Sequence, residues 1–231
     1  MILNGKELNY SFSQFRLYNE CPKKYKLKYF YSFQEPTNDN LILGSLIHKL
    51  FEIANTSNEE YDKLLYELHE HTGYFYTNKL SEEIKTFVNN LNILEKELKL
   101  YLNDFIGIID LVYKVADNSY NYVIADYKVT KKPKTKSSIY SESQLLIYKY
   151  IYCKINNIDP KSVAVQYINV SPNLKEKLIE PIEVYNPDIS ECESAFEATL
   201  DVQKKILNGE FPKKKTWCKW CFYKDICDNV E

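Results

Sequence analysis

The chain has 231 residues, of which 45% are hydrophobic and 27% are charged, so it is long enough to bury a core. Its 30 basic and 32 acidic side chains leave a net charge of -2, so any affinity for nucleic acid must come from local patches. Mean hydropathy is -0.44 and no long apolar run occurs, which excludes a membrane span. Residues 1–7 lack an apolar signal core. We therefore expect a cytoplasmic protein of one domain, or at most two small ones.

The first ninety residues have the apolar spacing of helices. In chain order the predicted elements are two short helices within 11–31 that break at Cys21-Pro22, a loop at 36–40, and helices at 44–54, 59–71 and 81–91.

The pattern then changes to alternating and β-branched residues, which are typical of strands. In chain order the predicted elements are strands at 94–100, 105–114 and 122–129 with a turn at 117–119, a loop at 131–138, a helix at 140–155, strands at 162–170 and 177–185, and a helix at 189–207. This order predicts an α/β core with helical additions.

The strands at 94–100, 105–114 and 122–129 are predicted to form a three-strand meander, and its second and third strands each contain an aspartate. In a hairpin centred on residue 118, residues whose numbers add to 236 face each other, so Asp110 lies across from Asp126 with Cβ atoms about 5 Å apart. The alternative, two aspartates that face solvent at a sheet edge, does not suit strands with such apolar flanks. Like charges in this position are destabilising unless a divalent cation compensates them. Lys128 shares the face of Asp126 and could position a water or neutralise charge on a phosphate.

Five motifs follow one another between residues 10 and 228. They are Cys21-Pro-Lys-Lys-Tyr25; Gly44-Ser-Leu-Ile-His48; Gly107-Ile-Ile-Asp110 followed by Asp126-Tyr127-Lys128; Gln144-x-x-x-Tyr148; and Cys218, Cys221 and Cys227 as CxxCxxxxxC. Together they resemble the PD-(D/E)XK nuclease superfamily, above all its RecB-type branch with the AddB-like and CRISPR-adaptation iron–sulfur exonucleases. The resemblance implies a restriction-endonuclease-like core, a central mixed sheet flanked by helices, with helical additions and an iron–sulfur clip that joins the termini.

The same resemblance implies a single nuclease domain over 1–231. In it, 1–35 and 209–231 would form the iron–sulfur clip, 41–91 the helical segment with the GxxxH motif, and 92–208 the nuclease core.

The resemblance implies a role for each motif residue. His48, Asp110 and Asp126 would bind Mg²⁺ or Mn²⁺, joined by the backbone carbonyl of Tyr127, and Lys128 would be the catalytic lysine.

Three further residues are implied near the site. Glu95 would be an acidic residue that faces it, although Glu97 has the same parity and stays open. Gln144 and Tyr148 share a helix face and would border the active site, with an ordinary amphipathic helix as the alternative for this pair.

The cysteines favour a 4Fe–4S cluster on Cys21, Cys218, Cys221 and Cys227, with zinc as the alternative. Structural zinc sites usually draw on two close pairs, whereas only Cys218 and Cys221 form one here and Cys21 lies almost two hundred residues away. The other two cysteines, Cys153 and Cys192, lie in helix-like stretches and are predicted to be core residues. A disulfide framework is not expected, because the cytosol keeps thiols reduced.

Three lysine clusters border these motifs, and two of them are interleaved with aromatic residues. Such patches suit a single nucleic-acid strand, with solvated faces and packing against the cluster as alternatives. They comprise Lys23, Lys24, Lys26 and Lys28; Lys131, Lys132, Lys134 and Lys136; and Lys213, Lys214, Lys215 and Lys219, with Tyr25, Tyr29, Trp217, Trp220 and Phe222.

By resemblance, the expected function is metal-dependent hydrolysis of DNA by an exonuclease, at single-stranded ends. The implied settings are recombination or repair, phage DNA metabolism and spacer processing. The implied partners are DNA and a helicase or a recombination or CRISPR protein, with no membrane. The alternative is a non-catalytic iron–sulfur or zinc DNA-binding subunit of a larger complex, against which the intact set of motif residues speaks.

Overall fold

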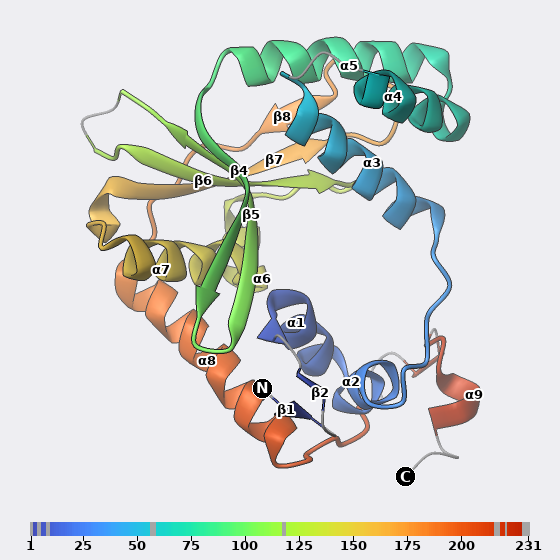
Figure 1. The fold of residues 1–231 in the computed structure, drawn as a ribbon, viewed down its shortest axis with the longest axis vertical. Coiled ribbons are helices and arrows are strands. Elements are labelled where there is room, and N and C mark those ends of the chain that lie inside the picture. The colour runs from blue at the N-terminus through green and yellow to red at the C-terminus, as the bar shows by residue number, and fades with distance from the viewer. Residues whose placement is uncertain are drawn as a thin grey trace. The chain divides into compact units, whose positions relative to one another are not determined.

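The computed structural model describes residues 2–3, 6–7, 10–55, 59–116, 119–214, 218–219 and 221–227. Its chain divides into two compact units (Figure 1). The terminal unit comprises Met1–Pro36, Tyr101–Gly107 and Ser194–Glu231, and the sheet unit comprises Thr37–Leu100 and Ile108–Glu193. The single-domain organisation expected from the sequence stays a prediction.

A mixed sheet runs through the structure. β5 pairs with β4 and, antiparallel, with β6; β6 is parallel to β7, which is antiparallel to β8. The short strand β3 pairs in parallel with the start of β5, and β1 and β2 form a separate hairpin. The strands are β1 (Ile2–Leu3), β2 (Lys6–Glu7), β3 (Tyr10–Ser11), β4 (Asn92–Leu102), β5 (Phe105–Lys114), β6 (Tyr122–Val129), β7 (Val163–Val170) and β8 (Ile179–Pro181).

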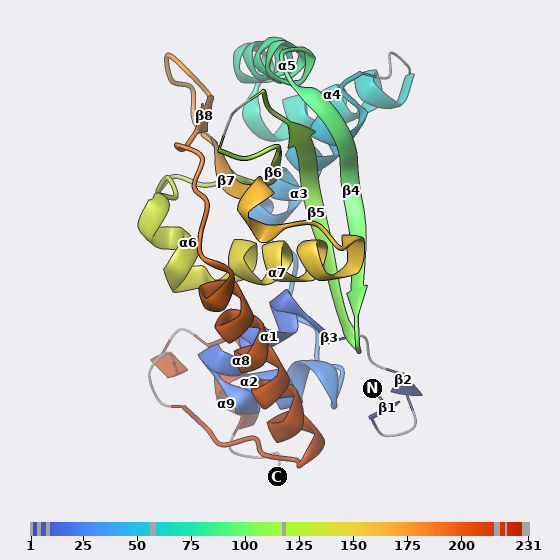
Figure 2. The same cartoon turned by 90° about the vertical axis from the view of Figure 1, so that its left-hand side faces the viewer.

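Helices cover both faces of the sheet within the sheet unit (Figure 2). α3 (Asp39–Ile53), α4 (Glu59–Thr72) and α5 (Tyr74–Asn89) pack on the face that carries the buried side chains of Val123, Ala125 and Tyr127. Because side chains alternate along β6, Asp126 and Lys128 point to the other face, where α7 (Gln144–Asn156) lies. The catalytic candidates of β6 therefore belong to the face opposite the main apolar core.

The terminal unit brings the two ends of the chain together. It contains α1 (Phe12–Glu20), α2 (Pro22–Tyr29), most of α8 (Ile189–Leu207) and α9 (Lys224–Cys227). The hydroxyl of Tyr18 donates to the carbonyl of Glu210 at 2.5 Å, and the hydroxyl of Tyr223 donates to the carbonyl of Phe33 at 2.8 Å. These bonds join the N-terminal helices to the C-terminal segment.

Most predicted elements are confirmed, including the three-strand meander of β4, β5 and β6 and the central mixed sheet. The predicted loop at 131–138 is wrong in its second half, because the capping box of Thr135 and Ser138 starts α6 (Lys136–Glu142) there. Ser143, at a φ of 62°, then separates α6 from α7.

Three boundaries also differ. The expected loop at 36–40 ends early, because Asn38 caps α3. The helix expected at 81–91 begins earlier, and the strand expected at 177–185 is reduced to β8 and a bridge of Tyr185 to Val165. Of the turn expected at 117–119, residues 117 and 118 lie outside the described residues.

In the part of the chain that is described, no helix has the length and apolarity to cross a bilayer.

Candidate active site

The register of the β5–β6 hairpin is the predicted one. The ladder runs from Leu111 opposite Ala125 to Lys114 opposite Tyr122, so facing residue numbers add to 236. The same sum assigns Asp110 to Asp126, directly beyond the last pair of the ladder. Next to this position, Oδ2 of Asp110 accepts a hydrogen bond from the backbone nitrogen of Tyr127 at 2.7 Å.

His48 of α3 reaches the same carboxylate. Its Nδ1 lies 3.5 Å from Oδ2 of Asp110, and its ring meets the ring of Tyr127 edge-on at 5.7 Å. Tyr127 is itself stacked on Phe51 at 4.0 Å, which fixes the helix against the sheet. Burial lowers the pKa of His48, but the carboxylates of Asp110 and Asp126 outweigh it and hold that pKa above its ordinary value.

Glu97 of β4 completes a candidate metal site. Ligand atoms of His48, Glu97 and Asp110 all lie within 4.8 Å of one another, the one such group found among the described residues. Burial, followed by the charges of Asp110 and Glu52, raises the pKa of Glu97. Three anionic or imidazole donors at this spacing suit a divalent cation, which removes the repulsion between the carboxylates.

Glu95 is not brought into this group, and its side chain is exposed. Regular alternation along β4 would place Glu95 and Glu97, which are two residues apart, on the same face. Glu97 has a φ of 50° and interrupts this alternation, so the two side chains lie in different environments. The sequence pattern carried no sign of this interruption.

Lys96 fastens β4 to the helix that carries His48. Its ammonium group donates to the carbonyl oxygens of Phe51 and Glu52 at 3.0 and 2.9 Å, at the C-terminal end of α3. A cation is favourable at this end of a helix, where carbonyl groups lack partners.

Asp126 and Lys128 form a buried ion pair on β6. Oδ2 of Asp126 lies 2.7 Å from Nζ of Lys128, and the aspartate side chain is only 4% exposed. Burial raises the pKa of Asp126 to about 6, against the opposing charge of Lys128 and with the support of the Asp110 charge. Asp126 therefore lies in an environment that favours a further cation.

Gln144 and Tyr148 of α7 extend this pair. Nζ of Lys128 donates to Oε1 of Gln144 at 2.8 Å, and the amide nitrogen of Gln144 lies 3.4 Å from the hydroxyl of Tyr148. Burial raises the pKa of Tyr148, so its hydroxyl keeps its proton. The structure thus brings both helix residues next to the candidate lysine.

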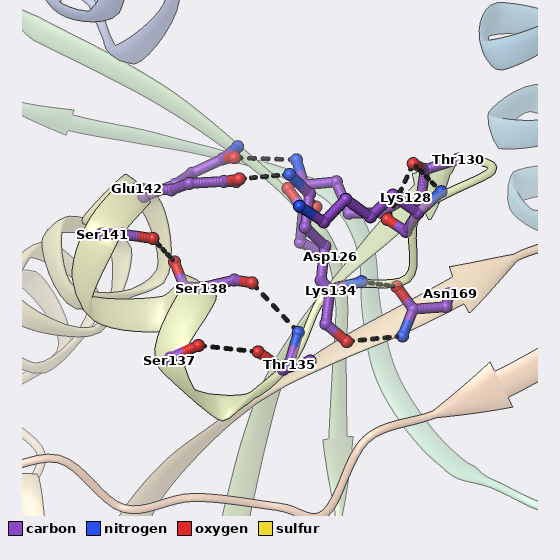
Figure 3. Close-up of polar contacts among 12 residues, drawn as sticks. Asp126, Lys128, Thr130, Lys134, Thr135, Ser137, Ser138, Ser141, Glu142 and Asn169 are labelled. Atoms are coloured by element: carbon purple, nitrogen blue, oxygen red, sulfur yellow. Dashed lines mark hydrogen bonds and ion pairs between the residues drawn. The ribbon is translucent and has the colours of Figure 1, made fainter.

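The segment after Lys128 is held by its own polar contacts (Figure 3). Oδ1 of Asn169 on β7 accepts from the backbone nitrogen of Lys134 at 2.7 Å, and its amide donates back at 3.0 Å. Lys134 also pairs with Glu142, and the hydroxyl of Thr130 donates to the carbonyl of Lys132 at 2.9 Å. These bonds fix the connection between β6 and α6 beside the site.

Four cysteines line a single pocket of about 270 Å³ in the terminal unit: Cys21, Cys218, Cys221 and Cys227. Their sulfur atoms do not form a group within 4.8 Å in the described part of the chain. Four thiolates on one zinc ion, at bond lengths of about 2.3 Å, would lie within about 4 Å of one another. Cys153 and Cys192 are buried, as predicted.

Some lysines of the three clusters contact acidic or aromatic side chains of the protein. Lys24 pairs with Glu20 at 3.3 Å and with Glu35 at 3.2 Å, and the ammonium of Lys136 lies 4.0 Å from the ring centre of Tyr185. Three members of the C-terminal patch, Lys215, Trp217 and Trp220, lie outside the described residues.

Comparison with known proteins identifies the family of the chain. The family model of the PD-(D/E)XK nuclease superfamily matches residues 9–228. A solved structure described as a "putative exonuclease" from Eubacterium rectale shares the fold, with a TM-score of 0.58 and 12% identity over 96% of this chain and 88% of that one. A second structure, described as SSO0001, has a TM-score of 0.38 and 15% identity over 91% and 96% of the two chains. No curated protein matches. The chain belongs to the PD-(D/E)XK nuclease superfamily.

Proposed function

We propose that this protein is a metal-dependent DNA exonuclease that hydrolyses phosphodiester bonds at single-stranded ends. One observation carries the proposal: the donor group of His48, Glu97 and Asp110 lies beside the buried pair of Asp126 and Lys128. Superfamily membership supports nuclease chemistry on this arrangement.

The donors present fit a hard divalent cation. His48, Glu97 and Asp110 would hold Mg²⁺ or Mn²⁺, with Asp126 and the backbone carbonyl of Tyr127 as the further ligands expected from the sequence. Oδ2 of Asp126 supports this role, because it is buried and its recorded contact is the ion pair with Lys128. Such a cation lowers the pKa of a bound water and stabilises negative charge on a phosphate.

The remaining residues act on the nucleophile and the phosphate. Lys128 presents an ammonium group whose direction is set by Asp126 on one side and Gln144 on the other. In this position it orients the attacking water and neutralises charge that develops on the phosphate oxygens. Gln144 and Tyr148 position Lys128 and do not themselves take part in bond breaking.

Action on DNA ends is supported by the resemblance of the motifs to the RecB-type branch and by the exonuclease description of the E. rectale protein. The settings that this resemblance implies are recombination or repair, phage DNA metabolism and spacer processing. A helicase or a recombination or CRISPR protein is the corresponding partner.

We also propose that the terminal unit holds a 4Fe–4S cluster. The support is that all four cysteines line one pocket. A cluster of four irons is larger than one zinc ion and binds sulfurs that lie farther apart. Its role would be structural, because it would join Cys21, near the N-terminus, to three cysteines near the C-terminus.

The experiment that tests the function is digestion of 5′- and 3′-labelled single-stranded DNA by anaerobically purified protein with Mn²⁺. The matched variant is Asp110→Asn, which keeps the size of the side chain and an oxygen for the Tyr127 nitrogen but removes the charge. The wild type should release nucleotides from one end, and the variant should lose that activity by at least about a hundredfold. If both proteins leave the DNA intact, the non-catalytic DNA-binding subunit is the correct description.

A further inference from the structure

A groove in the sheet unit leads away from the catalytic strand. One part of about 270 Å³ is lined by Val129, Thr130 and Lys131, the three residues that directly follow Lys128. A second part of about 480 Å³ shares Asn40, Leu43, Lys131 and Pro172 with the first, so the two are continuous. The second part also reaches His71, Thr72, Gly73, Tyr74, Phe75, Tyr76, Asn173 and Leu174.

The near end of this groove lies close to the metal donors. Leu43 lies five residues before His48 on α3, which is about 7.5 Å along the helix axis. Thr130 lies two residues after Lys128, about 7 Å along the chain. A nucleic-acid strand whose reacting phosphodiester lies at the candidate site would therefore reach the groove within a short distance.

The far end presents two open rings. Tyr74 is 63% exposed and Phe75 is 80% exposed, although both are large and aromatic. They occupy the first turn of α5, after Gly73, whose φ of 83° makes the corner from α4. Their ring centres lie 6.1 Å apart with a nearly perpendicular arrangement, and the ring of His69 meets Tyr74 edge-on at 6.0 Å.

The walls of the groove are fixed from within. The hydroxyl of Tyr76 donates to the carbonyl of Ser171 at 2.6 Å, which ties the start of α5 to the turn at 172–174. The hydroxyl of Ser171 in turn donates to the carbonyl of Asn173 at 3.0 Å. A site that is already ordered loses less conformational entropy when a ligand binds.

The charge of the groove suits a polyanion. None of its described lining residues is acidic, although 32 of the 231 residues of the chain are Asp or Glu. Lys131 is exposed at the junction of the two parts. Exposed rings next to a lysine, without carboxylates, provide stacking for bases and a countercharge for phosphates.

We propose that this groove binds the unpaired strand of the nucleic-acid substrate, with bases stacked on Tyr74 and Phe75 and a phosphate near Lys131. The inference rests on the proposed nuclease function, which it deepens by assigning the strand a path and a preference for unpaired bases. Stacking on both rings requires that the bases have left the duplex.

The test is the binding of a fluorescent oligothymidylate to the full-length protein, with Ca²⁺ in place of Mn²⁺, by anisotropy. Replacement of both rings, Tyr74→Ala with Phe75→Ala, should weaken binding at least tenfold. Tyr66→Ala is the matched control, because Tyr66 is 67% exposed on α4 but does not line the groove, and it should bind like the wild type. Tyr74→Phe should also retain binding, because it keeps the ring.

A second arm identifies base stacking. With an oligonucleotide of abasic units, the wild type and the double variant should bind equally, because only phosphate contacts remain. Two results would overturn the proposal. One is that the double variant binds oligothymidylate as tightly as the wild type. The other is that the double substitution weakens binding of the abasic strand as much as it weakens binding of oligothymidylate.

Hydrolysis of bis(4-nitrophenyl) phosphate separates this inference from the proposed function. This small diester does not reach the far rings, so the double variant should hydrolyse it at the wild-type rate. If the wild type lacks this hydrolysis and DNA cleavage, the nuclease proposal fails, while ring-dependent binding of the strand would still support the groove.

Discussion

Oδ2 of Asp110 accepts a hydrogen bond from the backbone nitrogen of Tyr127 at 2.7 Å and lies 3.5 Å from Nδ1 of His48. One carboxylate oxygen thus links the strand of Lys128 to the helix of His48. The Asp110 side chain therefore has a structural role beside the metal-binding role proposed for it.

Two substitutions of Asp110 should separate these roles. Asp110→Asn keeps an acceptor for the Tyr127 nitrogen and removes a charge that faces Asp126, so the metal-free variant should be at least as stable as the wild type. Asp110→Ala leaves that nitrogen without its partner and should lower the free energy of unfolding by about 1–2 kcal/mol. Urea unfolding in EDTA measures both values, and equal stabilities of the two variants would contradict the structural role.

Replacement of Lys128 should affect the chemical step. Lys128→Met leaves Asp126 buried without its ion-pair partner and removes the cation near the phosphate. We expect kcat to fall about 10²- to 10³-fold with a smaller change in KM. Lys132→Met, in an exposed position four residues later, should leave kcat unchanged. A similar fall in both variants would show that general loss of positive charge is responsible.

Gln144 should influence the rate through Lys128. Gln144→Leu removes the acceptor at 2.8 Å from Nζ, so the ammonium group loses one of its two recorded polar contacts. Because one hydrogen bond to a charged group is worth about 1.5–3 kcal/mol, kcat should fall at least about tenfold. Gln144→Glu keeps an acceptor and should retain more activity than Gln144→Leu. Steady-state kinetics of both variants, with unchanged circular dichroism, checks this order.

Metal binding should weaken as the pH falls through 6. Burial raises the pKa of Asp126 to about 6, and burial also raises the pKa of Glu97. Carboxyl groups with raised pKa values hold protons in mildly acidic solution, and a cation must displace these protons before it binds. A fixed concentration of Mn²⁺ should therefore raise Tm more at about pH 7.5 than at about pH 5.5. Equal shifts at the two pH values would contradict a site built on these groups.

Loss of one pocket cysteine should destabilise the fold. Cys21→Ala should lower the iron content of anaerobically purified protein and also lower Tm, because a crosslink between distant segments restricts the unfolded chain. Cys153→Ala is the control, because Cys153 is a buried core residue that does not line the pocket, and its replacement should keep the iron content. A colourless wild type that contains zinc and no iron would refute the 4Fe–4S assignment.

The sequence predicted the sheet register because a hairpin centred on residue 118 pairs residues whose numbers add to 236. Asp110 and Asp126 could be placed opposite each other on that basis, and the ladder has this register. Gln144 could be placed near Lys128 because of a family motif, and the two side chains are in contact.

The choice between Glu95 and Glu97 could not be made in the same way. Alternation along a strand is a rule of regular backbone, and the positive φ of Glu97 arises within a strand without a glycine to announce it. The start of α6 was missed for a related reason, since the capping box of Thr135 and Ser138 lies within a run of lysines and serines that is typical of a loop.

The bonds from Lys96 to the end of α3 have a consequence for ion affinity. They join the strand of Glu97 to the helix of His48 through the neighbouring residue Lys96, so we expect these two side chains to be held in place before a cation binds. Preorganised ligands bind a metal ion more tightly than ligands that lose conformational freedom when the ion binds. We therefore expect Lys96 to raise the affinity of the site for a cation without being a ligand itself.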